Sequence, residues 1–404
     1  MPSYSGVWTL TAQYQAIGGQ NWPMAPGAPT SVSATAGDAQ ATVTFVAPTF
    51  VGIPPPITGY LATSIPGGLT ATGASSPLTV TGLSNGTAYT FAVQATNAVG
   101  YGPAGTSGSV TPAAPDRGLF GGGSSNVIDY VAISTLGNAT DFGDLTNSPA
   151  QTSALANSVR GIWSGGASTN VIQYITIATT GNAADFGDLL APTFALAGLA
   201  NSTRGVIGGG FNNTTSSATN VIQYVTIATT GDAIDFGDLN KQRRGVASAS
   251  SSTRGLFAGG VDTDFNGSNT IDYVTIASTG NATNFGQLTI TIYLFAGCSS
   301  STRAVFGGGS LTTTGATQNV IQYVTIASTG NATDFGDLLN TNTEAIAACS
   351  NATRGLFAGG ADGPATNVIQ YITIASTGNS IDFGDLTTAR STLAGCSDCG
   401  GGLQ

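Results

Sequence analysis

An internal repeat constrains the fold of this chain more than any other feature of its sequence. Six segments begin with Arg-Gly or Arg-Ala, continue with apolar residues and end in a glycine pair. They start at Arg117, Arg160, Arg204, Arg254, Arg303 and Arg354. A short apolar run that stops at glycines predicts a strand ending in a turn. A repeat with a period of this length determines the whole architecture.

A second block follows each of these segments, as from Asn170 to Leu189. Its alternating apolar residues, Gly-Asn pair and Asp-Phe-Gly-Asp-Leu ending predict a hairpin whose turn contains Gly-Asn. The interval of 15 or 16 positions from that Leu to the next Arg leaves room for one more short strand. Each repeat therefore predicts four strands.

Four strands in 43 to 51 residues, measured between successive Arg positions, are typical of a propeller blade. The first copy lacks the strand that precedes each Arg, and residues 387–398 supply such a strand after the last copy. The sequence thus predicts an all-β six-bladed β-propeller over residues 113–404. The carboxy-terminal strand would complete the first blade and close the ring, which removes exposed sheet edges.

Almost all variation in repeat length falls between the Arg and the following Asn, which predicts exposed loops on one face. That face is the candidate binding site, and its polar and aromatic residues suit sugar recognition. The alternative is neutral drift of inert loops. The ligand-binding residues expected there are Phe211, Asn212, Asn213, Phe265, Leu311 and Asp362.

The fourth variable loop also has the spacing of a calcium loop. Oxygen-bearing side chains alternate at Asp262, Asp264 and Asn266 before Gly267. Tyr273 stands where an EF-hand has its bidentate Glu, so a solvated turn is the alternative. Calcium at these three residues is the one cofactor that the sequence suggests.

Paired aspartates, such as Asp185 and Asp188, recur in five copies and become Asn284 and Gln287 in the fourth. A catalytic pair should be unique, so repetition favours turn hydrogen bonds and pairing between blades. The recurring arginines, for example Arg254, are expected to form bidentate contacts with these carboxylates.

Three of the four cysteines, Cys298, Cys349 and Cys396, occupy one equivalent position where other copies have Leu or Ala. This predicts a buried wall rather than a metal site. Cys399 either pairs with Cys396 or stays free.

The composition excludes several functions. The chain has no histidine, which removes the usual Ser-His-Asp and Cys-His nucleophile systems. Its formal charge of −10 and lack of a basic stripe argue against nucleic-acid binding. No apolar run is long enough for membrane insertion, and the first residues do not look like a secretory signal.

The glycine pair, a Tyr in the next strand and an aromatic residue in the last strand resemble kelch repeats over residues 117–398. The tyrosines are Tyr130, Tyr174, Tyr224, Tyr273, Tyr323 and Tyr371. Phe142 and its five equivalents stand where that family favours Trp. The resemblance implies a fold and no activity.

Residues 27–112, with ATVTFVAP, ITGYLATS and LTVTGLSNGTAYTFAVQATNAVGYG, look like a fibronectin type III domain, an immunoglobulin-like sandwich of seven strands. Tyr89 would be its corner tyrosine, and Phe45 takes a position often held by Trp. The resemblance implies a spacer or adhesion module.

Residues 1–26, including GVWTLTAQYQAIGGQNWP, resemble leaders of structural proteins from tailed marine bacteriophages. The resemblance implies a non-enzymatic virion protein of the fibre or adhesin type, located on the particle outside the cell. Its leader would dock on other virion proteins and its propeller would bind a host-surface glycan or receptor. A homo-oligomer is possible.

Two alternatives stay open: a capsid decoration protein without a specific ligand, and a propeller glycan hydrolase or lyase that uses paired carboxylates.

Overall fold

The computed structural model describes residues 9–19, 22–113, 116–340 and 344–398, which fall into two compact units. Unit 1 spans Met1–Pro115 and unit 2 spans Asp116–Gln404. The described residues hold one helix, α1 (Leu10–Gly18), and otherwise strands, so the predicted all-β class is confirmed. Residues 1–8 and 20–21 of the predicted docking leader lie outside the described residues, as does Cys399.

Unit 1 contains two antiparallel sheets with one buried face each. One has the order β1-β2-β5 and the other β4-β3-β6-β7. The strands are β1 (Thr30–Gly37), β2 (Gln40–Val46), β3 (Gly59–Ile65), β4 (Thr70–Gly73), β5 (Leu78–Thr81), β6 (Thr90–Asn97) and β7 (Gly100–Thr106). Buried and exposed residues alternate along β2 and β6, as they do where two sheets enclose a core.

The two aromatic residues singled out in this sandwich both lie in its core. Tyr89 is buried, and its hydroxyl accepts a hydrogen bond of 3.0 Å from the backbone N of Ser84, as a corner tyrosine does. Phe45 is buried with its ring centroid 4.7 Å from that of Tyr60.

Unit 2 is built from six four-stranded antiparallel sheets, and the first strand of each is called here its inner strand. Sheet 1 joins β36 (Leu393–Ser397), β8 (Arg117–Gly122), β9 (Val127–Ala132) and β10 (Thr140–Asp144). Sheet 2 joins β11 (Ser153–Ala156), β12 (Arg160–Ser164), β13 (Val171–Thr176) and β14 (Ala184–Asp188). Sheet 3 joins β16 (Ala197–Ala200), β17 (Arg204–Gly208), β20 (Val221–Thr226) and β21 (Ile234–Asp238).

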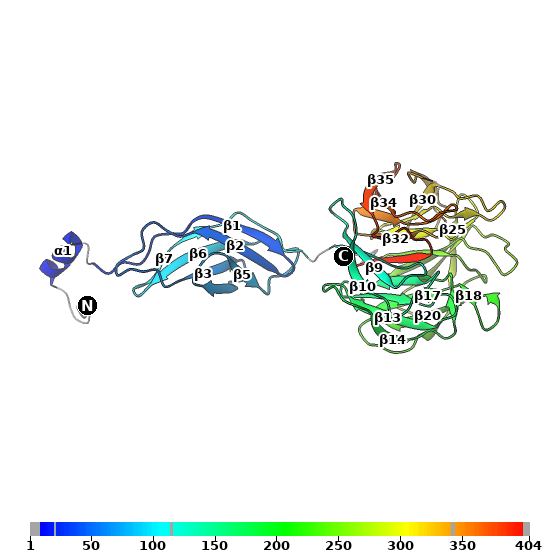
Figure 1. Cartoon of the computed structure of the whole chain (residues 1–404), viewed down its shortest axis with the longest axis horizontal. Coiled ribbons are helices and arrows are strands. Elements are labelled where there is room, and N and C mark those ends of the chain that lie inside the picture. The colour runs from blue at the N-terminus through cyan, green and yellow to red at the C-terminus, as the bar shows by residue number, and fades with distance from the viewer. Residues whose placement is uncertain (1–8, 20–21, 114–115, 341–343, 399–404) are drawn as a thin grey trace. The chain divides into compact units, whose positions relative to one another are not determined.

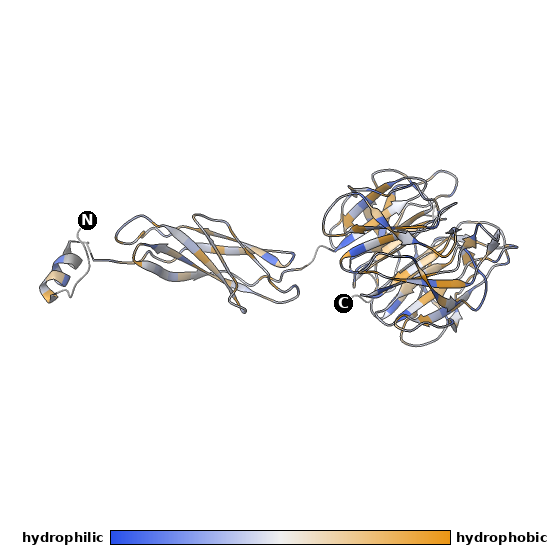
Figure 2. Cartoon of the chain, turned by 90° about the horizontal axis from the view of Figure 1, so that it is seen from below, coloured by the Kyte–Doolittle hydropathy of each residue, from blue (hydrophilic) through white to orange (hydrophobic). Residues whose placement is uncertain are grey.

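The other three sheets repeat the same order. Sheet 4 joins β22 (Ala247–Ser250), β23 (Arg254–Ala258), β24 (Thr270–Thr275) and β25 (Thr283–Gln287). Sheet 5 joins β27 (Ala296–Ser299), β28 (Arg303–Gly307), β30 (Val320–Thr325) and β31 (Thr333–Asp337). Sheet 6 joins β32 (Ala347–Ser350), β33 (Arg354–Ala358), β34 (Val368–Thr373) and β35 (Ile381–Asp385). Figure 2 shows hydrophobic residues along the strands of both units.

The carboxy-terminal strand β36 pairs antiparallel with β8, as expected from residues 387–398. In Figure 1 this red strand lies beside the green-blue strands that begin unit 2. β36 also contacts β32 of sheet 6 and β11 of sheet 2. The last and first segments of unit 2 therefore share one sheet.

A closed cycle of backbone hydrogen bonds joins the residues just before the inner strands. Each residue donates its N–H to the carbonyl of its counterpart one sheet earlier, over 2.8 to 3.0 Å. The cycle runs through Gln151, Ala195, Gly245, Leu294, Ala345 and Thr392. It closes because the N–H of Gln151 donates to the carbonyl of Thr392. Five of these are non-glycine residues with φ near +55°, a conformation that costs about 1 kcal/mol each. The cyclic hydrogen bonds compensate for that cost.

A second set of contacts links neighbouring sheets at the last strand of each, called here its outer strand. Gly181 N donates to Phe142 O at 2.8 Å, and Ala183 N donates to Asp144 O at 2.7 Å. The equivalent bonds from sheet 1 reach β35, since Gly137 N donates to Phe383 O at 3.0 Å. The connection between β9 and β10 contains the Gly137-Asn138 pair, as predicted. Its tight turn, however, closes between Thr135 N and Ala132 O, and Gly137 N bonds to the neighbouring sheet.

The core of unit 2 lies between neighbouring sheets. Each of its six hydrophobic clusters takes side chains from two successive sheets. The cluster between sheets 1 and 2 includes Leu119, Phe142 and the fully buried Trp163. Small hollows of about 70, 70 and 120 Å³ lie along the inner strands in the described residues. They are far below the roughly 300 Å³ of a typical ligand pocket.

The expected bidentate contacts between the recurring arginines and the paired aspartates are absent from the described residues, so that prediction is wrong. Arg254 stacks on Tyr273 of its own sheet at 4.5 Å, and its Nη1 donates to the carbonyl of Ile326 in sheet 5 at 2.8 Å. All six arginines make the equivalent hydrogen bond to an isoleucine carbonyl of the next sheet. Arg354 of sheet 6 donates to the carbonyl of Ile133 in sheet 1. The side chain lies over the tyrosine and ends at the corner of the next sheet, whereas the aspartates lie on the outer strands.

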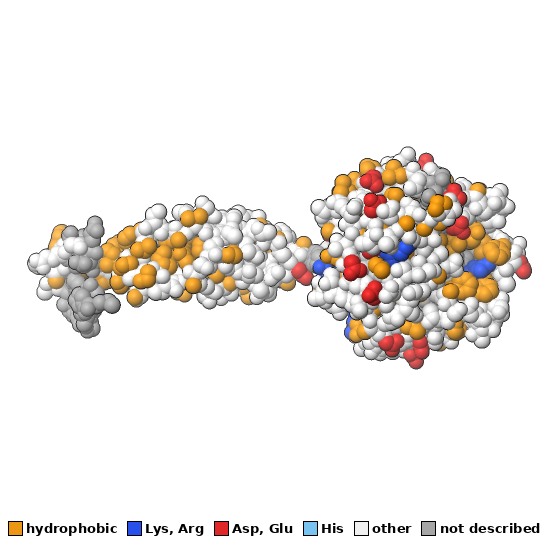
Figure 3. Space-filling model, viewed as in Figure 1, with side chains coloured by type: hydrophobic (Ala, Val, Ile, Leu, Met, Phe, Trp, Pro, Cys, Tyr) orange, Lys and Arg blue, Asp and Glu red, His pale blue; other side chains and the backbone are white. Residues whose placement is uncertain are grey.

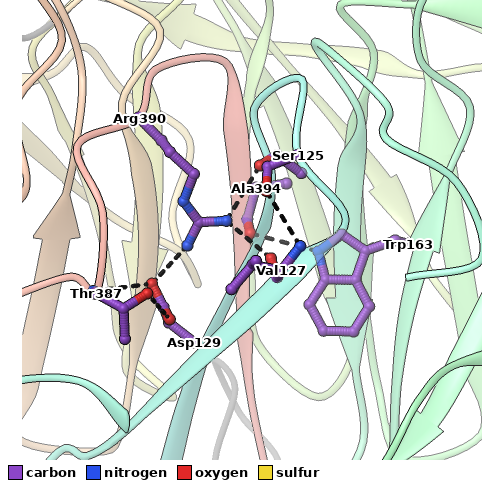
Figure 4. A network of polar contacts seen from close by, with 8 residues as sticks. Ser125, Val127, Asp129, Trp163, Thr387, Arg390 and Ala394 are labelled. Atoms are coloured by element: carbon purple, nitrogen blue, oxygen red, sulfur yellow. Dashed lines mark hydrogen bonds and ion pairs between the residues drawn. The ribbon is translucent and has the colours of Figure 1, made fainter. Parts of the chain in front are cut away.

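Two buried ion pairs, Arg390–Asp129 and Arg243–Asp272, are the ion pairs among the residues that the structure describes. Arg390 Nη2 donates to Asp129 Oδ2, and its Nη1 donates to the carbonyls of Gly122 and Val127 (Figure 4). Arg243 makes the matching bonds to Asp272, Gly259 and Thr270. Burial lowers the pKa of Arg243, and Asp272 partly opposes this shift.

Candidate functional site

Before each of sheets 3 to 6, the chain carries a charged or aromatic residue at one equivalent position. Each of these residues comes immediately before a residue of the closed hydrogen-bond cycle. Each also pairs with the residue that follows the glycine pair of a repeat. The four residues, here called the arc, are Phe194, Arg244, Tyr293 and Glu344. The other two sheets have Ala150 and Ser391. In a chain that otherwise repeats closely, this concentrates chemical variety on one side of the face.

Arg244 is the centre of the arc because two aromatic rings enclose its guanidinium. Its Cζ lies 4.9 Å from the ring centroid of Phe211 and 4.3 Å from that of Phe265. The ring of Phe211 also lies 5.2 Å from that of Phe194. Within the described residues, no carboxylate or carbonyl accepts a hydrogen bond from this guanidinium, and its Nε is buried without a partner. A cation between two ring faces keeps its hydrogen-bonding edge available.

A pocket of about 220 Å³ opens beside this stack. Gln151, Ala195, Arg244, Gly245, Phe265, Tyr293 and Leu294 line it. The lining therefore includes four residues of the backbone hydrogen-bond cycle, two members of the arc and one aromatic residue from a variable loop. Phe265 is 56% exposed, so its ring is available to a ligand from solvent.

Tyr293 lies within the electrostatic reach of both Arg244 and Glu344. Burial raises the pKa of its hydroxyl above the usual value, Glu344 raises it further, and Arg244 partly opposes the shift. The phenol thus keeps its proton at neutral pH and can donate a hydrogen bond into the pocket.

The structure brings together some of the residues that the sequence predicted for this face. Phe211 and Phe265, from the third and fourth variable loops, meet on Arg244. These loops also touch through Thr263 Oγ1, which accepts a hydrogen bond of 2.9 Å from Ala218 N. The loop strands are β15 (Thr193–Phe194), β18 (Phe211–Asn212), β19 (Ser217–Ala218), β26 (Ile292–Tyr293) and β29 (Ser310–Leu311).

The other predicted ligand residues have structural contacts or lie apart. Asn212 Oδ1 accepts from the backbone N of Thr214 and Thr215 and so holds its own turn. Asn213 Nδ2 is buried without a partner in the described part of the chain. Leu311 pairs with Ile292 and packs on the sheet 4–5 core, and Asp362 is exposed outside the pocket lining.

The predicted calcium loop is closed by its own side chains. Asp262 Oδ1 accepts from the backbone N of Asp264 and of Asn266, and its Oδ2 accepts from Asn266 Nδ2 at 2.9 Å. The bond with Asn266 is the main reason that the pKa of Asp262 is lowered. No group of three or more His, Cys, Asp or Glu residues suited to a metal occurs in the described ranges. Calcium binding there stays a prediction.

The three equivalent cysteines, Cys298, Cys349 and Cys396, are buried in the inner strands β27, β32 and β36. Burial raises the pKa of Cys298 to about 12 and that of Cys396 still further. Acidic side chains are scattered over the visible face of unit 2 (Figure 3).

Sequence reasoning missed the arc and the two buried ion pairs. The arc lies in connections of nearly constant length, where only residue identity signals a site. The ion pairs had a clear signal: Asp129 and Asp272 replace the Gln of the other four copies, and Arg390 and Arg243 occur in the connections beside them.

No curated protein sequence matches this chain significantly. A solved structure titled "Structure of YjhT" aligns with a TM-score of 0.52 at 8% identity, covering 60% of this chain and 86% of that chain. At this identity the likeness concerns the fold alone. No described helix is long and apolar enough to cross a membrane. The family model for the fibronectin type III domain matches residues 27–111, and this segment is a fibronectin type III domain.

Proposed function

We propose that unit 2 is a six-bladed, kelch-like β-propeller that serves as the binding head of a non-enzymatic virion protein. Six sheets of equal topology, the pairing of β36 with β8 and the cyclic backbone bonds support the closed architecture. The head binds a host-surface glycan or receptor through the face that carries the arc, and the fibronectin type III domain acts as a spacer.

The pocket beside Arg244 is the observation that carries the binding function. An exposed aromatic ring, a phenol and an unpaired guanidinium border a hollow on a scaffold fixed by backbone bonds. Aromatic surface with a few convergent polar groups is the usual composition of a ligand site. The paired aspartates repeat around the ring and give no unique acid and base, which favours binding over hydrolysis.

Glycan-array binding of the full-length chain tests this function. In one variant, residues 211–218 and 262–268 are replaced by the short loop of the second copy, residues 167–169. In the control variant, residues 362–365 of the sixth loop are shortened. Binding to a defined set of glycans should be lost in the first variant and kept in the control. Absence of binding to any glycan, or equal binding by all three proteins, would reject the function.

The virion assignment rests on the resemblance of residues 1–26 to phage leaders. Purified particles of the parent phage should contain this chain by mass spectrometry, and a chain lacking residues 1–26 should not be incorporated. Particles that incorporate the shortened chain equally well would contradict docking through this segment.

A further inference from the structure

Resting on this binding function, we infer that the pocket recognises an acidic sugar, whose carboxylate pairs edge-on with the guanidinium of Arg244. The sugar ring would then lie against Phe265 and the hydroxyl of Tyr293. This assigns a ligand class, uronic acid-type sugars, to the site.

The orientation of Arg244 is the first argument. Phe211 and Phe265 cover it from ring centroids 4.9 and 4.3 Å away. These ring contacts restrict the guanidinium before any ligand arrives, so less side-chain entropy is lost on binding. Its planar fork matches a carboxylate with two parallel hydrogen bonds.

The missing acceptor is the second argument. The other eight arginines, six in the repeats together with Arg243 and Arg390, all donate to carbonyls or carboxylates. Arg244 has only ring contacts among the described residues, whereas the Nη1 and Nη2 atoms of its neighbour Arg243 donate to Gly259, Thr270 and Asp272. A polar group held in place without a partner is the arrangement expected of a binding residue.

The size and remaining polarity of the pocket limit the ligand. About 220 Å³ is below the range for drug-sized ligands, so the pocket suits one terminal sugar unit. The protonated Tyr293 can donate to a ring hydroxyl or to the carboxylate. Glu344 forms no ion pair with Arg244 in the described chain, which leaves the positive charge free for a ligand anion.

Isothermal titration of the full-length chain with trigalacturonate and with neutral galactotriose tests the inference. Trigalacturonate should bind at least about tenfold more tightly, as expected for one charge-assisted pair. Arg244→Gln should remove this preference, and Arg244→Lys should keep only part of it because it lacks the planar fork. Lys241→Gln is the matched control, since it also removes one positive charge but concerns an exposed residue outside the pocket lining, and it should keep the preference. Unchanged thermal unfolding checks that each variant is folded.

The outcomes separate this inference from the binding function. If the wild type prefers galactotriose, or Arg244→Gln keeps the acidic preference, the carboxylate contact is wrong while glycan binding stands. Equal binding of a sulfated galactose would replace the carboxylate by a general anion and overturn the uronic acid assignment. Failure to bind any sugar, here and on the array, would reject both. Phe265→Leu should weaken all binding severalfold and preserve the acidic preference, and loss of only the preference would contradict the proposed ring contact.

Discussion

Arg390 and Asp129 form a fully enclosed ion pair, 2.5 Å from Nη2 to Oδ2, between the connection that precedes β36 and strand β9. Their side chains are 4% and 0% exposed. Asp129 Oδ1 also accepts from Thr387 Oγ1 at 2.6 Å. This network fastens the end of unit 2 to its beginning (Figure 4).

Replacing Arg390 by Met should lower the free energy of unfolding by about 3 to 5 kcal/mol, because Asp129 would remain buried without its partner. Adding Asp129→Gln, the residue of the other four copies, should recover most of the loss. Urea unfolding of the single and double variants measures the coupling. Equal losses in Arg390→Met and the double variant would show that the ion pair itself matters little.

Gly395 in β36 tests how closely the inner strands approach each other. A Cβ at this position would lie 2.6 Å from the carbonyl oxygen of Ala348 in sheet 6. Gly395→Ala should therefore cost about 1 to 3 kcal/mol of stability through overpacking. Gly330→Ala is the control, since its Cβ would meet nothing within 4 Å. Similar midpoints of thermal unfolding for both variants would argue against this close contact.

Arg254→Lys should destabilise unit 2 by about 1 to 2 kcal/mol, because Lys loses the stacking on Tyr273 and the geometry of the bonds to Ile326 and Ala327. Asp238→Asn should change stability by less than about 0.5 kcal/mol, since only its backbone joins the next sheet. Thermal unfolding distinguishes this arrangement from an Arg–Asp contact, which would make both substitutions costly.

Cys298 predicts a decline in stability at alkaline pH. Its pKa is raised to about 12 in the folded protein, from an ordinary value of 9.0. Between these values the unfolded thiol loses its proton while the folded thiol keeps it, so unfolding is increasingly favoured as pH rises from 9 to 12. Cys298→Ala should show a shallower loss over this range in urea unfolding. Parallel pH profiles for the two proteins would contradict the raised pKa.

The repeats made much of the fold predictable. Arginines and glycine pairs at regular intervals locate the strands of every sheet, and the unmatched segment 387–398 indicates the strand that joins β8. Tyr89 similarly locates the corner of the sandwich. In each case a short sequence pattern predicts the local backbone structure in which it occurs.

The site was less predictable because its residues come from different repeats. Phe211 and Phe265 were visible as loop aromatics, but their contact through Arg244 depends on how neighbouring sheets pack. The recurrence of both arginines and aspartates suggested that they pair with each other. The arginines instead donate to backbone carbonyls, whose positions no side-chain pattern reveals. The buried ion pairs could have been predicted only by noting that Asp129 stands where four other copies have Gln.

Hydrogen–deuterium exchange of the full-length chain, with and without its best-binding array glycan, tests whether the ligand binds beside Arg244. Exchange should be slower in peptides covering residues 193–195, 211–218, 243–245, 261–267 and 292–294, with no change in residues 27–111. Protection confined to the fibronectin type III domain, or to the opposite ends of the strands near Arg160 and Arg303, would contradict a binding site at Arg244.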